Sequence, residues 1–348
     1  MIKNISLVMC FMVMSSTYGQ DIHFSQFGMA LLHQNPTMAG AIYGIEATLN
    51  YKDQWRKVGA PYQTFAASYS MRLGKNSPNK KGFFALGANF FSDKAGDSKM
   101  GTNLGGVNVA YHIYLNRYNT LGAGINLGLF QRTADFSSLQ WGNQFDGQFY
   151  SSLLPSGENE GVSSFTGYNS GAGFLWTYKN DDGKFKVTNN NEKSVRIGCS
   201  VNHFNHPKYS FTGSAEKLPL KLVAHGGAIL SFSNTNFALV PGFIYMRQGS
   251  AQEINIGSMF RYLIGQNSKF TGYKKAAAIY IGAFYRVKDA ITANLLLEYG
   301  NWGVGISYDI NTSKLVAATK TRGGMELSLR FVAPNPYITS YGGNNSRF

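Results

Sequence analysis

One stretch near the end of the chain, Met325 to Phe331, reads MELSLRF. Its odd-numbered residues are apolar or aromatic, and its even-numbered residues are polar or charged. Successive side chains of a β-strand point to opposite faces, whereas a helix would mix these two sets on its surface. The stretch therefore predicts a strand with one apolar face and one polar face.

The same alternation occurs in the two segments before it, Ala290–Tyr299 and Trp302–Asp309, which a tight turn at Gly300-Asn301 separates. Fourteen such segments can be read along the chain, most of them near the 9–11 residues that a tilted strand needs to cross a bilayer. The predicted strands are Ile45–Tyr51, Gln63–Met71, Gly82–Ser92, Leu104–Tyr114, Thr120–Thr133, Ser170–Tyr178, Val195–His203, Lys221–Phe232, Phe237–Arg247, Gln252–Tyr262, Ala277–Arg286, Ala290–Tyr299, Trp302–Asp309 and Gly324–Phe331.

An even strand count is typical of single-chain bacterial barrels. Residues 45–331 are therefore predicted to form an all-β fold, a transmembrane antiparallel β-barrel of about 14 strands in the outer membrane. An open sheet edge in hydrocarbon leaves backbone groups unpaired at several kcal/mol each, so the first strand must pair with the last. In the last strand we expect Met325, Leu327, Leu329 and Phe331 to face lipid.

Composition agrees with this fold. Aromatic residues make up 14% of the chain, 40 residues are glycine, and charged residues make up only 14%, against about 25% in ordinary soluble domains. No stretch beyond the N-terminal leader reaches the roughly 18 apolar residues of a spanning helix. The net charge is +14, but the basic residues are scattered, so we expect no nucleic-acid partner. They are interpreted as loop residues that face anionic lipid head groups or peptidoglycan, or as contacts for an acidic protein partner.

The ends of the chain are predicted to lie outside the barrel wall. Residues 1–19 have one lysine, a short apolar core and small residues before Gln20, the pattern of a cleaved signal peptide. Cys10 lies in that apolar core, so the mature chain keeps only Cys199 and no internal disulfide is expected. Residues 20–44 show no sustained alternation and are predicted to be a periplasmic or barrel-plugging segment. Residues 332–348 are predicted to be a C-terminal tail.

If the chain enters the first strand from the periplasm, the loops after odd-numbered strands face outward. The long outward loops are then Ala134–Asn169, Phe204–Leu220 and Asn311–Gly323. The inner loop Lys179–Ser194 is longer than this rule expects.

Signatures of catalysis are weak. Gly96-Asp97-Ser98 is similar to a lipase nucleophile block, but no Asp-x-x-His follows it to supply a base. His203 and His206 could approach a metal, but no third ligand lies near them in the sequence. The glycines of Gly122-x-Gly124-x-x-x-Gly128 miss the dinucleotide-binding spacing and are interpreted as relieving crowding where a strand bends. We therefore expect no enzyme activity, no cofactor and no metal.

Five charged residues fall on polar strand faces. They either form a charged lumen lining that selects solutes or neutralise one another in a closed interior, for example Glu326 with Arg330, and the second interpretation is favoured. The residues are Glu253, Glu298, Glu326, Arg196 and Arg330.

A set of loose motifs resembles the PorP/SprF family of Bacteroidota outer-membrane proteins, which is associated with the type IX secretion system and gliding motility. The motifs follow one another in the family's order across nearly all of the mature chain; Met38, where the family often has an aromatic or small residue, is a departure. They are Phe24-Ser25-Gln26, Asn35-Pro36-Thr37-Met38-Ala39-Gly40, Asp53-Gln54-Trp55-Arg56, Gly59-Ala60-Pro61 with Thr64, Asp135-Phe136-Ser137 with Trp141-Gly142, and Gly198-x-Ser200-Val201-Asn202-His203 with Pro207.

From these motifs we take twelve candidate partner-binding or family-signature residues. They are Phe24, Gln26, Asn35, Pro36, Gly40, Gln54, Trp55, Arg56, Pro61, Trp141, Asn202 and Pro207. Asn35-Pro36 reads as a turn and Gly40 as a hinge, which either fix the path into the first strand or contact a partner. Trp55 either anchors at the membrane interface or serves as a binding hot spot.

The resemblance implies a non-enzymatic outer-membrane barrel that binds type IX cargo, such as a surface adhesin with a sorting C-terminal domain, or couples to periplasmic secretion-ring proteins. The long loops would present the cargo-binding surface, and the N-terminal segment and the tail would face the periplasm. The alternative is a passive porin or hydrophobic-solute channel. An outer-membrane lipase acting through Ser98 is a third, disfavoured hypothesis.

Overall fold

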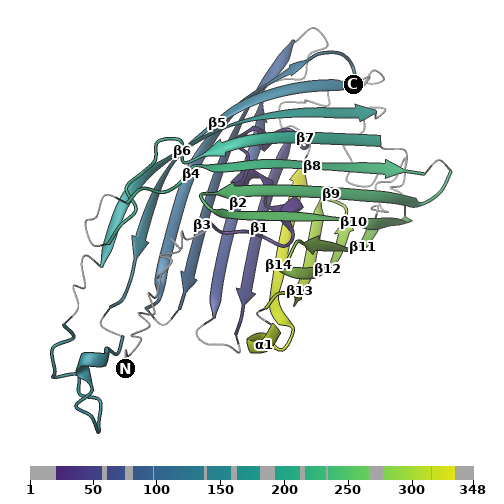
Figure 1. Ribbon diagram of the computed structural model, residues 1–348. Helices are drawn as coiled ribbons and strands as arrows, with labels where there is room; N and C mark the ends of the chain where they lie inside the picture. The colour runs from purple at the N-terminus through teal and green to yellow at the C-terminus, as the bar shows by residue number, and fades with distance from the viewer. Residues whose placement is uncertain are drawn as a thin grey trace, which may run out of the picture.

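The polypeptide wall closes on itself as a barrel (Figure 1). The computed structural model describes residues 21–56, 61–74, 81–96, 98–136, 139–157, 163–180, 193–211, 216–232, 234–265, 277–314 and 316–333. Within them, fourteen antiparallel strands pair in sequence order and β1 pairs with β14. The predicted fold class and strand count are confirmed.

The strands match the predicted segments, with ends that differ by a few residues. They are β1 Ile45–Gln54, β2 Tyr62–Leu73, β3 Gly82–Ala95, β4 Met100–Tyr114, β5 Asn119–Thr133, β6 Ser164–Asn180, β7 Lys193–Asn202, β8 Lys221–Ser231, β9 Phe237–Gln248, β10 Ala251–Gly265, β11 Ala277–Arg286, β12 Ala290–Tyr299, β13 Trp302–Asn311 and β14 Arg322–Ala333. The short helices are η1 Phe27–Met29, η2 Leu31–His33, η3 Pro36–Met38, η4 Gly142–Gln144 and α1 Val316–Thr319. None of the helices in the described part of the chain is long and apolar enough to cross a membrane.

Side chains alternate between the two faces of the wall as the sequence predicts. Along β12 every second residue from Ala290 is buried, and the residues between them are exposed on the outer surface. In β14 Met325 and Leu327 are exposed, whereas Glu326 and Ser328 are buried. The outer surface therefore carries the apolar side chains that a lipid environment requires.

The predicted seam between the first and last strands is present. Ile45 lies opposite Ala333 and Gln54 lies opposite Gly324, so β1 is paired along its whole length. Two residues assigned to the tail, Val332 and Ala333, belong to β14. The rest of the predicted tail, the signal peptide at residues 1–19 and most of the inner loop Lys179–Ser194 lie outside the described residues and stay predictions.

The largest difference in strand ends is at β6, which starts at Ser164 rather than at Ser170. Ser164 pairs with Thr133, so the β5–β6 hairpin continues beyond the predicted wall. The outward-facing residues Ser164 and Thr166 are polar there, so the apolar alternation of the outer face stops before the strand does. The outward loop is accordingly shorter than the predicted Ala134–Asn169.

The described part of the N-terminal segment, residues 21–44, lies inside the barrel (Figure 1). We call the barrel end with the loops after odd-numbered strands the loop mouth, and the opposite end, where β1 begins, the turn mouth. At the loop mouth Asp21 contacts His203 and Lys221. At the turn mouth the backbone N–H of Arg72 donates to the carbonyl of Gly44 at 2.8 Å. The segment therefore runs through the lumen from one mouth to the other.

The hydrophobic core is the interface between this segment and the wall. Phe27 packs edge-on against Phe284, with ring centroids 5.3 Å apart. Phe24 belongs to a cluster with wall residues that include Phe91 and Phe130, and Met29 belongs to another. A barrel wall exposes its apolar face to lipid, so burial of apolar surface away from lipid depends here on the internal segment.

Candidate functional site: the filled lumen and its loop mouth

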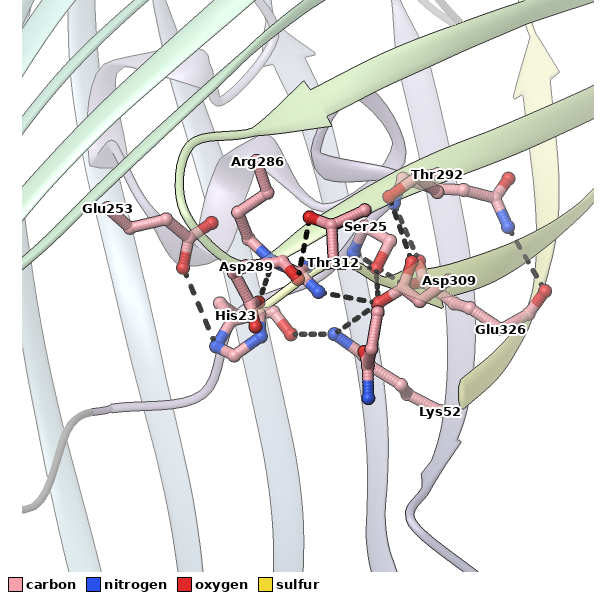
Figure 2. Close-up of polar contacts among 12 residues, drawn as sticks. His23, Ser25, Lys52, Glu253, Arg286, Asp289, Thr292, Asp309, Thr312 and Glu326 are labelled. Carbon is pink, nitrogen blue, oxygen red and sulfur yellow. Dashed lines mark hydrogen bonds and ion pairs between the residues drawn. The ribbon is translucent and has the colours of Figure 1, made fainter. Parts of the chain in front are cut away.

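A buried polar cluster holds the start of the N-terminal segment near the loop mouth (Figure 2). The carboxylate of Asp309 on β13 accepts hydrogen bonds from Arg286 on β11 at 2.7 Å, from the Ser25 hydroxyl at 2.8 Å and from Thr292 on β12 at 2.9 Å. Lys52 on β1 approaches the same carboxylate at 4.0 Å. Charge-assisted hydrogen bonds in a site closed to water are strong, so Asp309 ties four wall strands and the segment together.

Glu326 on β14 binds the backbone of the segment. Its carboxylate accepts the N–H of Ser25 at 2.7 Å and the N–H of Gln26 at 3.2 Å. The side chain of Gln26 in turn bonds to the Glu326 carbonyl and accepts from the Ser328 hydroxyl. Glu326 thus fixes the direction of the chain rather than pairing with a cation on its own strand.

The predicted pair of Glu326 with Arg330 is therefore wrong. Arg330 forms its ion pair with Glu298 on β12. Four residues along one strand span about 13 Å, too far for an ion pair. Glu298 and Arg330 instead lie on either side of Gly303 in the strand register, and the absent side chain of that glycine lets them meet across β13.

His23 joins the cluster from the segment itself. Its Nδ1 lies 3.6 Å from the Glu253 carboxylate on β10, and its carbonyl accepts from Lys52 at 3.1 Å. Burial, together with the positive charges of Lys52 and Arg286, lowers the pKa of His23 well below its ordinary value. The imidazole is therefore neutral at physiological pH, and Figure 2 shows it between Glu253 and the Lys52 contact.

The first described residue is clamped at the rim of the loop mouth. The carboxylate of Asp21 lies 2.7 Å from Nε2 of His203 and 3.4 Å from Nζ of Lys221. Its backbone N–H donates to the side chain of Gln248 at 2.9 Å. Burial alone would raise the pKa of Asp21, but the charges of His203 and Lys221 outweigh it and hold the pKa well below its ordinary value.

In the middle of the lumen, Asn35 makes the central contacts. Its Oδ1 accepts the N–H of Thr37 and caps η3, in which Pro36 occupies the first position. Its Nδ2 donates to the carbonyls of Phe174 and Cys199 on β6 and β7. One side chain thus ends a turn of the segment and bonds it to two strands.

Glycines of the wall leave the room that η3 occupies. A Cβ at Gly173 would lie 2.1 Å from Oδ1 of Asn35, and one at Gly124 would lie 2.9 Å from the N of Thr37. Gly122 also faces Thr37. The interpretation that these glycines relieve a bend is therefore replaced for Gly122 and Gly124, because both allow close approach of the internal segment.

At the turn mouth, Arg72 on β2 binds the end of the internal segment. Its guanidinium donates to the carbonyl of Gly40 at 2.5 Å and to that of Ala41 at 2.9 Å, and it lies 4.5 Å from the ring centroid of Phe83. Gly40 has a φ of +60°, and a Cβ there would lie 2.7 Å from that of Ala85. The predicted hinge is a position that only glycine fills without strain.

The family model for the type IX secretion system membrane protein PorP/SprF matches residues 16–331 of the chain. The chain belongs to the PorP/SprF family. The resemblance read from the motifs is confirmed, and with the closed barrel it places this PorP/SprF protein in the outer membrane. A search of curated proteins finds no match.

Solved structures similar to this PorP/SprF barrel are outer-membrane proteins of low sequence identity. The TodX monoaromatic hydrocarbon channel (deltaS2 mutant) has a TM-score of 0.46 and 10% identity, covering 87% of this chain and 92% of that one. BamA from Haemophilus ducreyi, lacking POTRA domains 1–3, has a TM-score of 0.41 and 9% identity, covering 84% and 70%. The KdgM porin in complex with disordered oligogalacturonate has a TM-score of 0.35 and 8% identity, covering 82% and 99%.

The structure separates the signature residues of this PorP/SprF protein into two groups. Those inside the lumen bind the internal segment to the wall; among them, Asn202 on β7 donates from Nδ2 to the Gln34 carbonyl at 3.1 Å. The lumenal group is Phe24, Gln26, Asn35, Pro36, Gly40 and Asn202.

The second group lies at the loop mouth. Trp55 has a φ of +56° and packs against Tyr62 with ring centroids 5.0 Å apart, so its ring lies between the end of β1 and the start of β2. Arg56 is exposed and reaches Asp53 at 2.5 Å. Pro207 is buried and its carbonyl accepts the N–H of Leu218 at 2.9 Å. The remaining members are Gln54 at the end of β1, the half-buried Pro61, and Trp141 at the start of η4.

Sequence reasoning missed the residues that anchor the segment most strongly. Lys52, Arg286 and Asp309 form the ionic cluster, and Arg72 closes the turn mouth. Each is a charged residue on the polar face at or next to the end of a predicted strand. This position is the sequence signal from which a role in the lumen could have been predicted. The predicted strands end at Tyr51 and Met71, so Lys52 and Arg72 fall in predicted loops, whereas the structure includes them in β1 and β2.

The two candidate chemical sites receive little support. Asp21 and Asn169 hold the ring nitrogens of His203, whereas His206 is exposed. Within the residues that the structure describes, no three His, Cys, Asp or Glu side chains are grouped to hold a metal. The carbonyl of Ser98 accepts the N–H of Asp135, and Asp97 lies outside the described residues.

Proposed function

We propose that this protein is a non-enzymatic barrel of the type IX secretion machinery that holds cargo or a surface adhesin at the outer membrane, with the loop mouth facing outward. The family supports a role in secretion. The observation that carries the rest is the filled lumen: Asn35, Thr37 and Ala39 in the centre of the internal segment are fully buried. The polar surface that a partner can reach is therefore at the two mouths of the barrel and not along a channel through it.

The cargo would contact the loops after β5, β7 and β13. These loops rise from a rim that the Asp21 clamp and the Asp309 cluster stabilise, so they start from fixed positions. A rigid base reduces the entropy lost on binding. The partner we propose is a secreted protein or adhesin with a sorting C-terminal domain, and coupling to periplasmic ring proteins would use the turn mouth.

This geometry changes one expectation about the N-terminal segment. We expected it to face periplasmic partners, but its first described residue, Asp21, lies at the loop mouth. Only the residues near Gly40 and Gly44 approach the turn mouth. In the proposed orientation Asp21 lies on the cargo side.

The passive porin is the competing function. It requires a continuous aqueous path through the barrel, whereas the internal segment contacts the wall at both mouths and in the middle. One layer of side chains that fills the cross-section of the lumen is enough to interrupt this aqueous path. The filled lumen therefore favours the binding function.

Affinity purification from native outer membranes tests the proposal. We expect the tagged protein to recover one large secreted surface protein, and we expect the same tag on another barrel of the same cells not to recover it. Recovery of periplasmic ring proteins instead would assign the coupling role. If neither class is enriched over the control barrel, the binding function is refuted.

A further inference from the structure

The loop between β5 and β6 forms a lobe, residues 139–157, that projects beyond the rim of the loop mouth (Figure 1). At its tip Phe145 and Tyr150 form a β-bridge. Oδ1 of Asp146 accepts the N–H groups of Gln148 and Phe149 at 2.8 and 2.7 Å, which closes the turn between them. The tip is thus a hairpin with its own turn chemistry.

A second set of hydrogen bonds ties the two arms of the lobe. The Gln144 side chain accepts from the N–H of Trp141 and donates to the carbonyl of Leu154. Asn143 donates to the carbonyl of Ser156 at 3.1 Å. The lobe therefore has a defined shape that it maintains with its own residues, so a partner would bind it with little loss of conformational entropy.

This shape holds large apolar side chains out in solvent. The exposed fraction is 93% for Leu153, 72% for Phe149 and 54% for Phe145. Most of the other exposed apolar side chains lie on strands, where lipid covers them. The lobe lies beyond the strands, and exposed apolar side chains of this kind mark interaction sites.

The charge of the whole loop indicates what the lobe contacts. Residues 134–163 contain four acidic residues, Asp135, Asp146, Glu158 and Glu160, and no lysine or arginine, in a chain with a net charge of +14. Anionic lipid head groups would repel this loop, because like charges in proximity disfavour association. A cationic protein surface would attract it and would gain speed and specificity of docking from that attraction.

We propose that the lobe docks a protein whose contact surface carries lysine and arginine around apolar pockets, with Phe149 and Leu153 as the anchoring side chains. This inference rests on the proposed function and names the chemistry of the partner at the outer face. Large apolar and aromatic side chains that enter pockets of the partner, inside a polar rim, are the usual centre of a binding interface. The net negative charge of the loop sequence sets the orientation and the salt dependence of the contact.

Site-specific photo-crosslinking in native cells tests this docking with the full-length barrel. A photoreactive amino acid replaces Leu153, and the control places it at Lys288, an exposed residue of the β11–β12 turn at the same mouth, which is not one of the proposed cargo loops. We expect a protein adduct from position 153 whose crosslinked peptide has a net positive charge. Both E158K/E160K and F149S should reduce its yield roughly tenfold, because the first reverses the charge and the second removes an anchor.

Three results would overturn the docking proposal: an adduct with lipopolysaccharide or phospholipid, no adduct above the Lys288 control, or a protein adduct that the charge reversal leaves unchanged. Heat-modified migration on gels confirms that each variant forms its barrel. If cargo co-purifies equally with the wild type and with E158K/E160K, the lobe proposal fails and the proposed function stands. If the wild type retains no cargo, the proposed function fails.

Discussion

Deleting residues 21–43 is expected to turn a barrel that conducts almost no ions into an open pore, raising the current at fixed voltage roughly tenfold or more. The segment occupies the lumen from the Asp21 clamp to the Arg72 contact, so removing it frees the space between the fourteen strands. Barrels of this size leave an aqueous channel when nothing fills them. Planar-bilayer recording of the purified protein measures the change.

A substitution keeps this test informative if the deletion variant fails to assemble. Ser25→Asp places a carboxylate against Asp309 and Glu326, which already face Ser25. Like charges in a buried site repel strongly, so intermittent openings are expected. Ser25→Ala is the matched control, because it keeps the backbone N–H that Glu326 accepts. A wild-type barrel with a steady large conductance, or a deletion variant that stays closed, would contradict the filled lumen.

The second large effect is expected at Asp309. Asp309→Asn removes the charge that Arg286 and Lys52 face in a buried site and should lower the free energy of unfolding by about 3–5 kcal/mol, because buried cations then lack compensation. The matched control is Asp289→Asn, which removes a carboxylate from the same Arg286 at a site whose side chain is 35% exposed. That change should cost less than about 1 kcal/mol.

Urea titration in lipid vesicles, followed by the heat-modified gel shift of the folded barrel, measures both variants. Proteolysis of the internal segment should also increase for Asp309→Asn and not for Asp289→Asn, because Asp309 also holds Ser25. Equal midpoints for the two variants would show that the cluster does not anchor the segment.

The wall of the barrel could be predicted from the sequence because each strand carries its own period-two signal. β11 and β12 match the predicted ends without change, since Ala290–Tyr299 alternates without interruption. The predicted β6 starts six residues late, because the outward-facing Ser164 and Thr166 are polar while backbone pairing with β5 continues. Backbone hydrogen bonding does not depend on which side chains alternate.

The contents of the lumen were less accessible to sequence reasoning. The segment before β1 shows no alternation of polar and apolar residues, so the sequence could not decide whether it lies in the periplasm or in the lumen. Which charged side chains pair inside the barrel depends on the register between strands. Arg330 meets Glu298 because both lie opposite Gly303, and no spacing along the sequence reveals this relation. The Gly122 and Gly124 pair, two residues apart and so on one face, was the available sign that something approaches the wall there.

Collision accessibility of spin labels along β12 tests the central claim most directly. After Cys199, the one cysteine of the described chain and exposed, is replaced by serine, single cysteines at Leu295, Leu297, Thr292 and Asn294 carry the label in lipid bilayers. We expect high oxygen accessibility at the two leucines, which face outward, and low accessibility to both oxygen and a water-soluble nickel complex at Thr292 and Asn294, which are buried against a filled lumen. Equal accessibility at all four positions, or free access of the nickel complex to Thr292 and Asn294, would contradict a barrel whose alternate side chains meet lipid and a closed interior.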